Sequence, residues 1–366
     1  MNKLFQFLFV GLIVGSNGLT AFAAVTIPFT DSNISKYGRY IDDAIGANLT
    51  WSGSWMRFKV SGTTNIRLNV QVNLSSNAVG QLQSYIDGAM QPDAFAIVPA
   101  TNQDQTVTLV RGLTPGEHTV VVQVGEWLAH SPLVSSNEYI KIKNIIIDDG
   151  GTLSAWPQTG TYHMLFLGDS WAGDGNSVTR FFNPDRWTVW TVGFGGFQAG
   201  TMNTYYPYKA AGVAHTDPPQ DLCVIQYGVN DYFGKVATAT FKSNVQSIMD
   251  KVVADHSGIK FFLVQVPANG TNYYDKYGTV LSELAAENTN TYYISTTAIA
   301  SNLTWNGAAH IAAASRDTIY TPYLDAQISS YWAGHGHYVT TNGGSVSPYT
   351  NRSDAATNIL HQKNTK

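Results

Sequence analysis

The stretch that decides the fold of the second half of the chain is Leu165-Phe166-Leu167-Gly168-Asp169-Ser170-Trp171-Ala172. Its apolar residues close the run 162–167, which predicts a buried strand, and the serine follows in a tight turn. A serine at the carboxyl end of a strand is a typical position for a nucleophile. The turn differs from the G-x-S-x-G elbow of the α/β-hydrolases, because Ala172 stands where that motif has its last glycine. The stretch therefore predicts a nucleophile turn of another kind, in which Asp169 has a structural role.

Similar apolar runs recur beyond this turn, and helical patterns lie between them. The runs are 188–192, 222–227, 260–266 and 291–295, and the clearest helical stretches are 239–254 and 277–287. Apolar strands that alternate with helices predict a mostly parallel sheet with both faces covered, that is, a three-layer α/β domain. In such sheets the chemistry lies at the carboxyl ends of the strands.

The chain before this domain has a different pattern. Alternating runs that are typical of half-buried strands occupy residues 55–60, 66–72, 106–110, 118–124 and 140–147, with short polar turns between them. Several short strands with regular turns predict an all-β sandwich or jelly roll. We therefore expect a β-sandwich domain at 24–152, a linker, an α/β domain at 160–331 and a C-terminal tail at 332–366.

Two further motifs follow predicted strands of the α/β domain. The strand at 188–192 is followed by Gly193-Phe194-Gly195-Gly196, and the strand at 222–227 by Gly228-Val229-Asn230-Asp231. Together with the Gly-Asp-Ser turn, this order resembles the SGNH (GDSL-type) hydrolases. The resemblance implies that Ser170 is the nucleophile and that the Ser170 N–H, the Gly196 N–H and the Asn230 side chain form the oxyanion hole. These are the donors that acyl transfer needs for the negative oxygen of its transition state.

The general base is the least clear part of the resemblance. The family has Asp-x-x-His after its last strand, whereas this chain has Gly307-Ala308-Ala309-His310 before a predicted terminal helix at 313–331. We expect His310 to be the base, and His335 and His337 remain alternatives. Because Gly307 replaces the acid, a backbone carbonyl is expected to orient the imidazole, which gives a Ser–His dyad.

The order of the two domains narrows the resemblance. A jelly roll before an SGNH domain resembles carbohydrate esterase family two, whose members remove acetyl groups from plant-type polysaccharides, and the stretch 51–58 resembles an early strand of that sandwich. Trp171 and Tyr232 lie beside the motifs and are expected to cover sugar faces. The resemblance implies no metal and no cofactor.

Composition sets the remaining expectations. The net charge of −4 argues against a nucleic-acid partner, and the single Cys223 excludes an intrachain disulfide. An apolar run at 4–14 and Ala21-Phe22-Ala23 form a signal-peptide pattern with cleavage before Ala24, which predicts a secreted or periplasmic protein. An uncleaved anchor is the alternative, and no later segment is long and apolar enough to span a membrane.

The sequence thus favours a secreted serine esterase that deacetylates carbohydrates. A broader lipase, arylesterase or O-acetyltransferase would use the same chemistry. From another class, a carbohydrate-binding protein with a degenerate hydrolase domain is the alternative.

Overall fold

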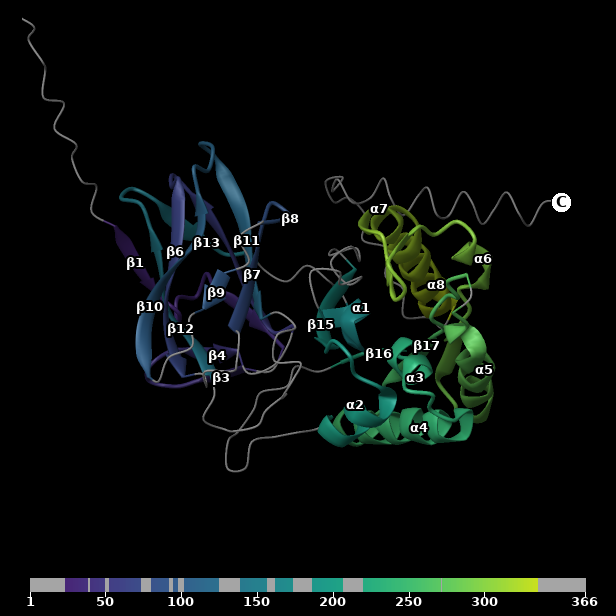
Figure 1. Cartoon of the computed structure of the whole chain (residues 1–366). Coiled ribbons are helices and arrows are strands. Elements are labelled where there is room, and N and C mark those ends of the chain that lie inside the picture. Colours follow the sequence, from purple (N-terminus) through teal and green to yellow (C-terminus); the bar gives the residue numbers. More distant parts are fainter. Residues whose placement is uncertain are drawn as a thin grey trace, which may run out of the picture.

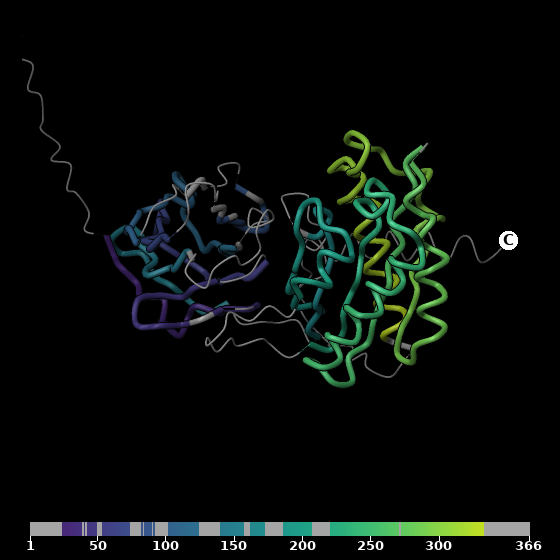
Figure 2. The backbone as a smooth tube through the Cα atoms, turned by 60° about the horizontal axis from the view of Figure 1, so that its bottom comes forward, coloured from purple at the N-terminus to yellow at the C-terminus, as the bar shows by residue number. Residues whose placement is uncertain are grey.

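The chain folds into a β-sandwich and an α/β domain that lie side by side (Figures 1 and 2). The computed structural model describes residues 24–38, 40–49, 53–73, 80–91, 95–97, 102–124, 139–156, 162–173, 186–206, 220–270 and 272–334. The signal-peptide pattern, Trp51, His335 and His337 lie outside these residues. The predicted fold class, a sandwich followed by a three-layer α/β domain with a parallel sheet, is confirmed.

The sandwich is built from short strands whose side chains alternate between its core and its surface. β6 shows the pattern most clearly, since buried and half-buried residues alternate along its whole length. The strands of this domain are β1 Val25–Pro28, β2 Ser35–Tyr37, β3 Tyr40–Asp42, β4 Ala47–Leu49, β5 Trp55–Ser61, β6 Asn65–Asn73, β7 Gly80–Ile86, β8 Ala89–Met90, β9 Phe95–Ile97, β10 Gln103–Arg111, β11 Glu117–Val124, β12 Tyr139–Ile147 and β13 Thr152–Ser154.

Two antiparallel sheets enclose the sandwich core. Among the described residues one sheet has the order β10-β6-β12-β4-β3, with β1 beside β12, and the other has the order β13-β5-β11-β7-β8, with β2 beside β5 and β9 beside β7. Apolar side chains such as Phe58, Leu68 and Val122 fill the space between them. β13 pairs with β5, so the sandwich extends two residues beyond the predicted boundary at 152.

The α/β domain has a parallel sheet with the order β15-β14-β16-β17-β18 in the described residues. Its strands are β14 Tyr162–Gly168, β15 Trp187–Gly193, β16 Leu222–Gln226, β17 Lys260–Val264 and β18 Thr291–Ile294. The short hairpin of β19 Trp305–Asn306 and β20 His310–Ile311 follows. β16 is buried at every residue, which is why its sequence is a continuous apolar run that includes Cys223.

Helices cover both faces of this sheet. Side chains from α2, α4 and α5 pack on one face, and side chains from α1, η4 and α8 pack on the other. The helices are α1 Ser170–Gly173, α2 Ala199–Tyr205, α3 Val229–Phe233, α4 Thr238–Asp255, η3 Tyr274–Tyr277, α5 Gly278–Glu287, α6 Thr297–Ala300, α7 Ala313–Ser315, η4 Arg316–Tyr320 and α8 Thr321–Gly334. None of the helices in the described ranges has the length and apolarity of a membrane-spanning helix.

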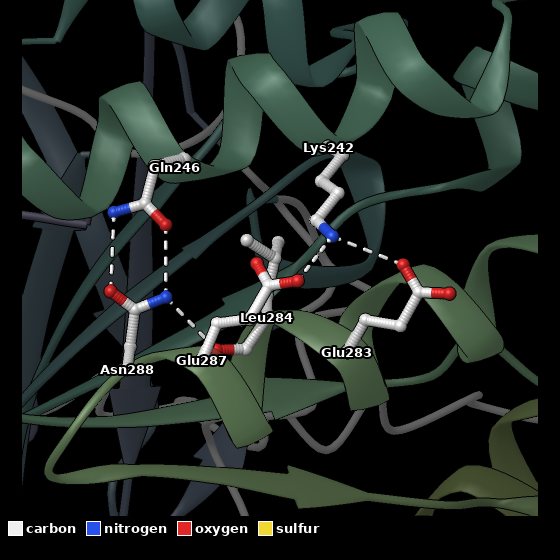
Figure 3. Close-up of polar contacts among 6 residues, drawn as sticks. All are labelled: Lys242, Gln246, Glu283, Leu284, Glu287 and Asn288. Atoms are coloured by element: carbon white, nitrogen blue, oxygen red, sulfur yellow. Dashed lines mark hydrogen bonds and ion pairs between the residues drawn. The ribbon is translucent and has the colours of Figure 1, made fainter.

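A polar network joins α4 to α5 on the outer surface (Figure 3). Lys242 Nζ forms ion pairs with Glu283 (3.1 Å) and Glu287 (2.7 Å). One helical turn away, Asn288 Nδ2 donates to Gln246 Oε1 (2.9 Å). The carboxylates raise the pKa of Lys242. Because the carboxylates are exposed, these ion pairs contribute little to the stability of the fold.

The two domains meet along β15, the edge strand of the parallel sheet. Trp55 Nε1 donates to the Val189 carbonyl (3.1 Å), and Gly53 packs against the Thr191 carbonyl. Tyr37 and Trp55 lie in the same buried cluster as the sheet residue Trp190. The sandwich therefore covers an edge that would otherwise expose unpaired backbone groups.

The predicted terminal helix at 313–331 is wrong in one respect. It is interrupted by a π-helical turn, η4, between α7 and α8. This turn brings the Tyr320 ring edge-on to Trp171, with their centroids 5.4 Å apart. The interruption therefore coincides with a tertiary contact that the local sequence does not encode.

Candidate active site

The carboxyl ends of three neighbouring strands are level with one another. Gly168 on β14 is in register with Gly193 on β15 and with Gln226 on β16. The segments that follow these strands therefore begin at one edge of the sheet. They hold the predicted nucleophile, Ser170, and the predicted oxyanion donors Gly196 and Asn230.

A serine and a histidine face each other at this edge. Ser170 Oγ lies 2.7 Å from His310 Nε2, although 140 positions separate the two residues. Ser170 begins α1 and His310 begins β20, and both side chains are half-buried. This distance allows a proton to pass from the hydroxyl to the imidazole, which is the first requirement of an activated serine.

The second nitrogen of the imidazole was expected to meet a backbone carbonyl. Within the described ranges His310 makes no hydrogen bond or ion pair besides the contact with Ser170. Gly307, three positions earlier, has φ +72 and occupies the turn of the β19–β20 hairpin. In the described residues the ring is therefore held by the Ser170 contact and by the backbone that carries it.

Asp169 holds the nucleophile turn and Asn230 together. Its Oδ1 accepts the Trp171 backbone N–H (3.0 Å), and its Oδ2 accepts the Asn230 side-chain amide (3.2 Å). The same Asn230 nitrogen also donates to the Phe197 carbonyl (3.2 Å). The structural role predicted for Asp169 is confirmed by these bonds. They fix the Asn230 amide beside Ser170.

Gly196 lies in a tight turn after β15. The Phe197 N–H donates to the Phe194 carbonyl (3.2 Å) across the turn. Gly196 has φ +78, and it is exposed. A glycine is required here because a turn of this type needs positive φ at its third residue.

Asp231 anchors the loop beside Asn230 from a fully buried position. Both of its oxygens accept the Ala199 N–H, at 3.3 and 3.2 Å, and so tie the start of α2 to α3. Burial, partly offset by these bonds and by Lys276, raises the pKa of Asp231 to about 6. The carboxyl therefore keeps its proton in the folded state over a pH range in which the unfolded chain has lost it.

This raised pKa predicts a stability that falls as pH rises. The folded state binds more protons than the unfolded state between the unfolded pKa of 3.8 and about 6. The free energy of unfolding of the wild type, relative to Asp231→Asn, should therefore fall by about 2 kcal/mol from pH 4.5 to pH 8. Denaturant titrations of both proteins at the two pH values measure this difference. An unchanged difference would contradict the raised pKa.

The structure corrects one of the two expected sugar contacts. The Trp171 ring is only 2% exposed, and its Nε1 donates to the Ala309 carbonyl (2.8 Å), so it is not available to a substrate. Tyr232 is half-buried, and Lys276 Nζ lies 5.5 Å from the centroid of its ring. Phe233 is 49% exposed, and its ring lies against the ring of buried Tyr274. Tyr273, which directly precedes Tyr274 in the sequence, is 59% exposed.

Two residues that no sequence motif indicates contact the loop before His310. Asn269 and Tyr274 lie after β17, and both donate to carbonyls of residues 307–308. Their position after β17 could have indicated a place near the site, since β17 ends at the same edge of the sheet as the other strands. No metal-ligating group of three or more His, Cys, Asp or Glu is found in the described part of the chain.

Comparison with known families finds a match to the first domain. The carbohydrate esterase 2 N-terminal family matches residues 37–157. A comparison with curated proteins finds no match.

Solved structures share the fold of the whole chain. A family two carbohydrate esterase from Clostridium thermocellum in complex with cellohexaose has a TM-score of 0.61 at 18% identity, with 82% of this chain and 99% of that chain covered. A family two carbohydrate esterase from Cellvibrio japonicus has a TM-score of 0.61 at 17% identity, with 84% and 98% covered. An acetyl xylan esterase from the rumen bacterium Butyrivibrio proteoclasticus has a TM-score of 0.63 at 10% identity, with 87% and 100% covered.

These identities are low, so the likeness to solved structures concerns the fold. It extends over nearly the full length of each of these proteins and includes both domains. Residues 37–157 of the first domain match the carbohydrate esterase 2 N-terminal family, and the chain as a whole shares the two-domain fold of these solved structures.

Proposed function

We propose that this protein is a secreted serine esterase that removes O-acetyl groups from carbohydrates. The observation that carries the proposal is the 2.7 Å contact between Ser170 Oγ and His310 Nε2 at the carboxyl edge of the parallel sheet. A hydrolase fold without this pair could be a binding protein. With it, the site has a nucleophile and a base in reach of each other.

The reaction follows from these two groups. Ser170 Oγ attacks the acetyl carbonyl while its proton moves to His310 Nε2. The same proton then goes to the sugar oxygen as the C–O bond breaks, which leaves an acetyl-serine. A water molecule gives a proton to His310, attacks the acetyl-serine and releases acetate, and the proton returns to Ser170 Oγ.

The oxyanion of both tetrahedral intermediates needs donors that are already in place. We assign this role to the Ser170 N–H, the Gly196 N–H and Asn230 Nδ2. Asp169 and the Phe197 carbonyl hold Asn230 Nδ2 from two sides, each at 3.2 Å. Both contacts lie at the upper end of the normal hydrogen-bond range, and the assignment requires the amide to share one of its two hydrogens with the substrate oxygen when charge develops there. Losing such a donor costs about 10²–10³ in kcat.

Three observations favour a carbohydrate acetyl ester as substrate. The first domain matches the carbohydrate esterase 2 N-terminal family. The structural neighbours include proteins described as an acetyl xylan esterase and as an esterase in complex with cellohexaose. Phe233, which directly follows the half-buried Tyr232, exposes about half of its ring, and such rings can cover a sugar face.

Release of acetate tests the proposal. Wild type and Ser170→Ala are compared on acetylated xylan, acetylated cello-oligosaccharides, acetylated pectin and an aryl acetate. We expect the wild type to release acetate from at least one carbohydrate and the variant to release none. Acetate transfer to a sugar acceptor instead of water would identify an acetyltransferase. Retention on a polysaccharide column without hydrolysis of any ester would favour the binding-protein alternative.

A further inference from the structure

Side chains hold three consecutive carbonyls of the loop that leads into His310. Asn269 Nδ2 donates to the Gly307 carbonyl (3.2 Å) and to the Ala308 carbonyl (3.0 Å). The Tyr274 hydroxyl also donates to the Ala308 carbonyl. Trp171 Nε1 donates to the Ala309 carbonyl at 2.8 Å. All of these bonds come from outside the hairpin, and the last of them ends on the residue next to the base.

Trp171 is the residue that ties this loop to the nucleophile. It directly follows Ser170, and its backbone N–H donates to Asp169 in the nucleophile turn (3.0 Å). Its indole therefore joins the neighbour of the nucleophile to the neighbour of the base. The ring is buried between Trp305, with centroids 6.0 Å apart, and Tyr320, with centroids 5.4 Å apart. It has little freedom to turn away from the Ala309 carbonyl.

We infer that Trp171 is a positioning residue that holds His310 in line with Ser170 through the Ala309 carbonyl. The inference rests on the proposed esterase function. In a complete triad an acid bonded to the imidazole fixes the ring, but here no such partner of His310 is found in the described residues. The orientation of the ring then depends on the position of its own backbone, which Trp171 fixes at the adjacent residue.

Trp171→Phe removes the Nε1 donor and keeps an aromatic ring. Since a small misplacement of a catalytic group costs about 10²-fold in rate, we expect kcat for an aryl acetate to fall about 10- to 100-fold, with KM nearly unchanged. Trp187→Phe is the matched control. Trp187 is equally buried, its Nε1 donates to Asp325 Oδ1 (2.6 Å), and it lies at the other end of the sheet. Trp187→Phe should lose about as much stability as Trp171→Phe and should keep the wild-type kcat.

A second readout observes the imidazole directly. In spectra of ¹⁵N-histidine-labelled protein, with His310 assigned from the His310→Gln variant, Trp171→Phe should shift the His310 ring resonances and Trp187→Phe should not. The inference is overturned if these resonances do not move, or if kcat of Trp171→Phe equals that of Trp187→Phe. If the wild type hydrolyses no ester, the proposed function fails, and the resonances still decide whether Trp171 holds the ring.

Tyr274→Phe carries the test if Trp171→Phe does not fold. It removes the donor to the Ala308 carbonyl and keeps the ring, and a loss of up to about 10-fold in kcat is expected. Its control is Tyr277→Phe, which removes a hydroxyl donor to the Val236 carbonyl (2.9 Å), away from the hairpin. Equal kcat values and unmoved His310 resonances in this second pair would mean that the bonds to this loop do not position the imidazole, and this would contradict the premise of the inference.

Discussion

Replacement of either Ser170 or His310 by alanine is expected to lower kcat for an aryl acetate by at least about 10⁴-fold. The two side chains share one proton path, because Ser170 Oγ and His310 Nε2 are 2.7 Å apart. Without the imidazole the hydroxyl keeps its proton, and without the hydroxyl the imidazole has nothing to activate. The residual activity comes from the oxyanion donors alone, and it should be similar in the two variants.

The double variant makes this prediction sharper. If the two groups act as one unit, Ser170→Ala/His310→Ala should be no slower than either single variant. If they act independently, the losses should multiply. Steady-state kinetics on all three proteins, with circular dichroism to verify the fold, distinguish the two cases.

The identity of the base is tested in the same series. His335→Ala and His337→Ala should keep kcat within about twofold of the wild type, because neither change touches the pair that we assign to catalysis. A loss in either variant that equals the loss in His310→Ala would reject His310 as the base.

The position of the site at one edge of the sheet could be predicted because each motif that forms it lies directly after a strand in the sequence. Gly168-Asp169-Ser170 and Gly228-Val229-Asn230-Asp231 each follow an apolar run directly, and strands β14 and β16 end where these motifs begin. Parallel pairing then brings the two motifs together without further information. For the same reason the fold class followed from the order of strands and helices.

The role of Trp171 could not be predicted in this way. Its indole donates to the Ala309 carbonyl, 138 positions away, and packs on Tyr320 from a π-helical turn. An aromatic residue next to a nucleophile has the same local sequence whether it faces a sugar or the core. The ring is in the core because the hairpin of β19 and β20 and the turn that carries Tyr320 both pack against it.

The contact between the domains could not be predicted from the sequence either, and Gly53 shows the reason. It precedes β5 in a stretch rich in Gly, Ser and Trp that is compatible with many turns. In the structure it has φ +74, and a Cβ at this position would lie 1.7 Å from the Thr191 carbonyl oxygen of β15. The glycine is needed because two backbones approach closely, and the second of them belongs to the other domain.

Gly53→Ala is therefore expected to cause the largest loss of stability among conservative changes in the described part of the chain. The added methyl meets a backbone oxygen, which no rotamer change can move, so the sandwich must shift away from β15. That shift breaks the bond from Trp55 Nε1 to the Val189 carbonyl (3.1 Å) and exposes buried rings. We expect a loss of at least about 4 kcal/mol in the free energy of unfolding, measured by denaturant titration.

Gly112→Ala separates this clash from backbone strain. Gly112 has φ +73, almost the same as Gly53, but nothing lies within 4 Å of a Cβ built on it. Gly112→Ala should therefore lower the free energy of unfolding by only about 1–2 kcal/mol, which is the cost of an alanine in the left-handed conformation. The difference in stability between the two variants measures the packing of the sandwich against β15.

Because β15 leads into the Gly196 turn, Gly53→Ala should also lower kcat, whereas Gly112→Ala should not. Equal stability losses in the two variants would mean that the domains do not depend on this contact.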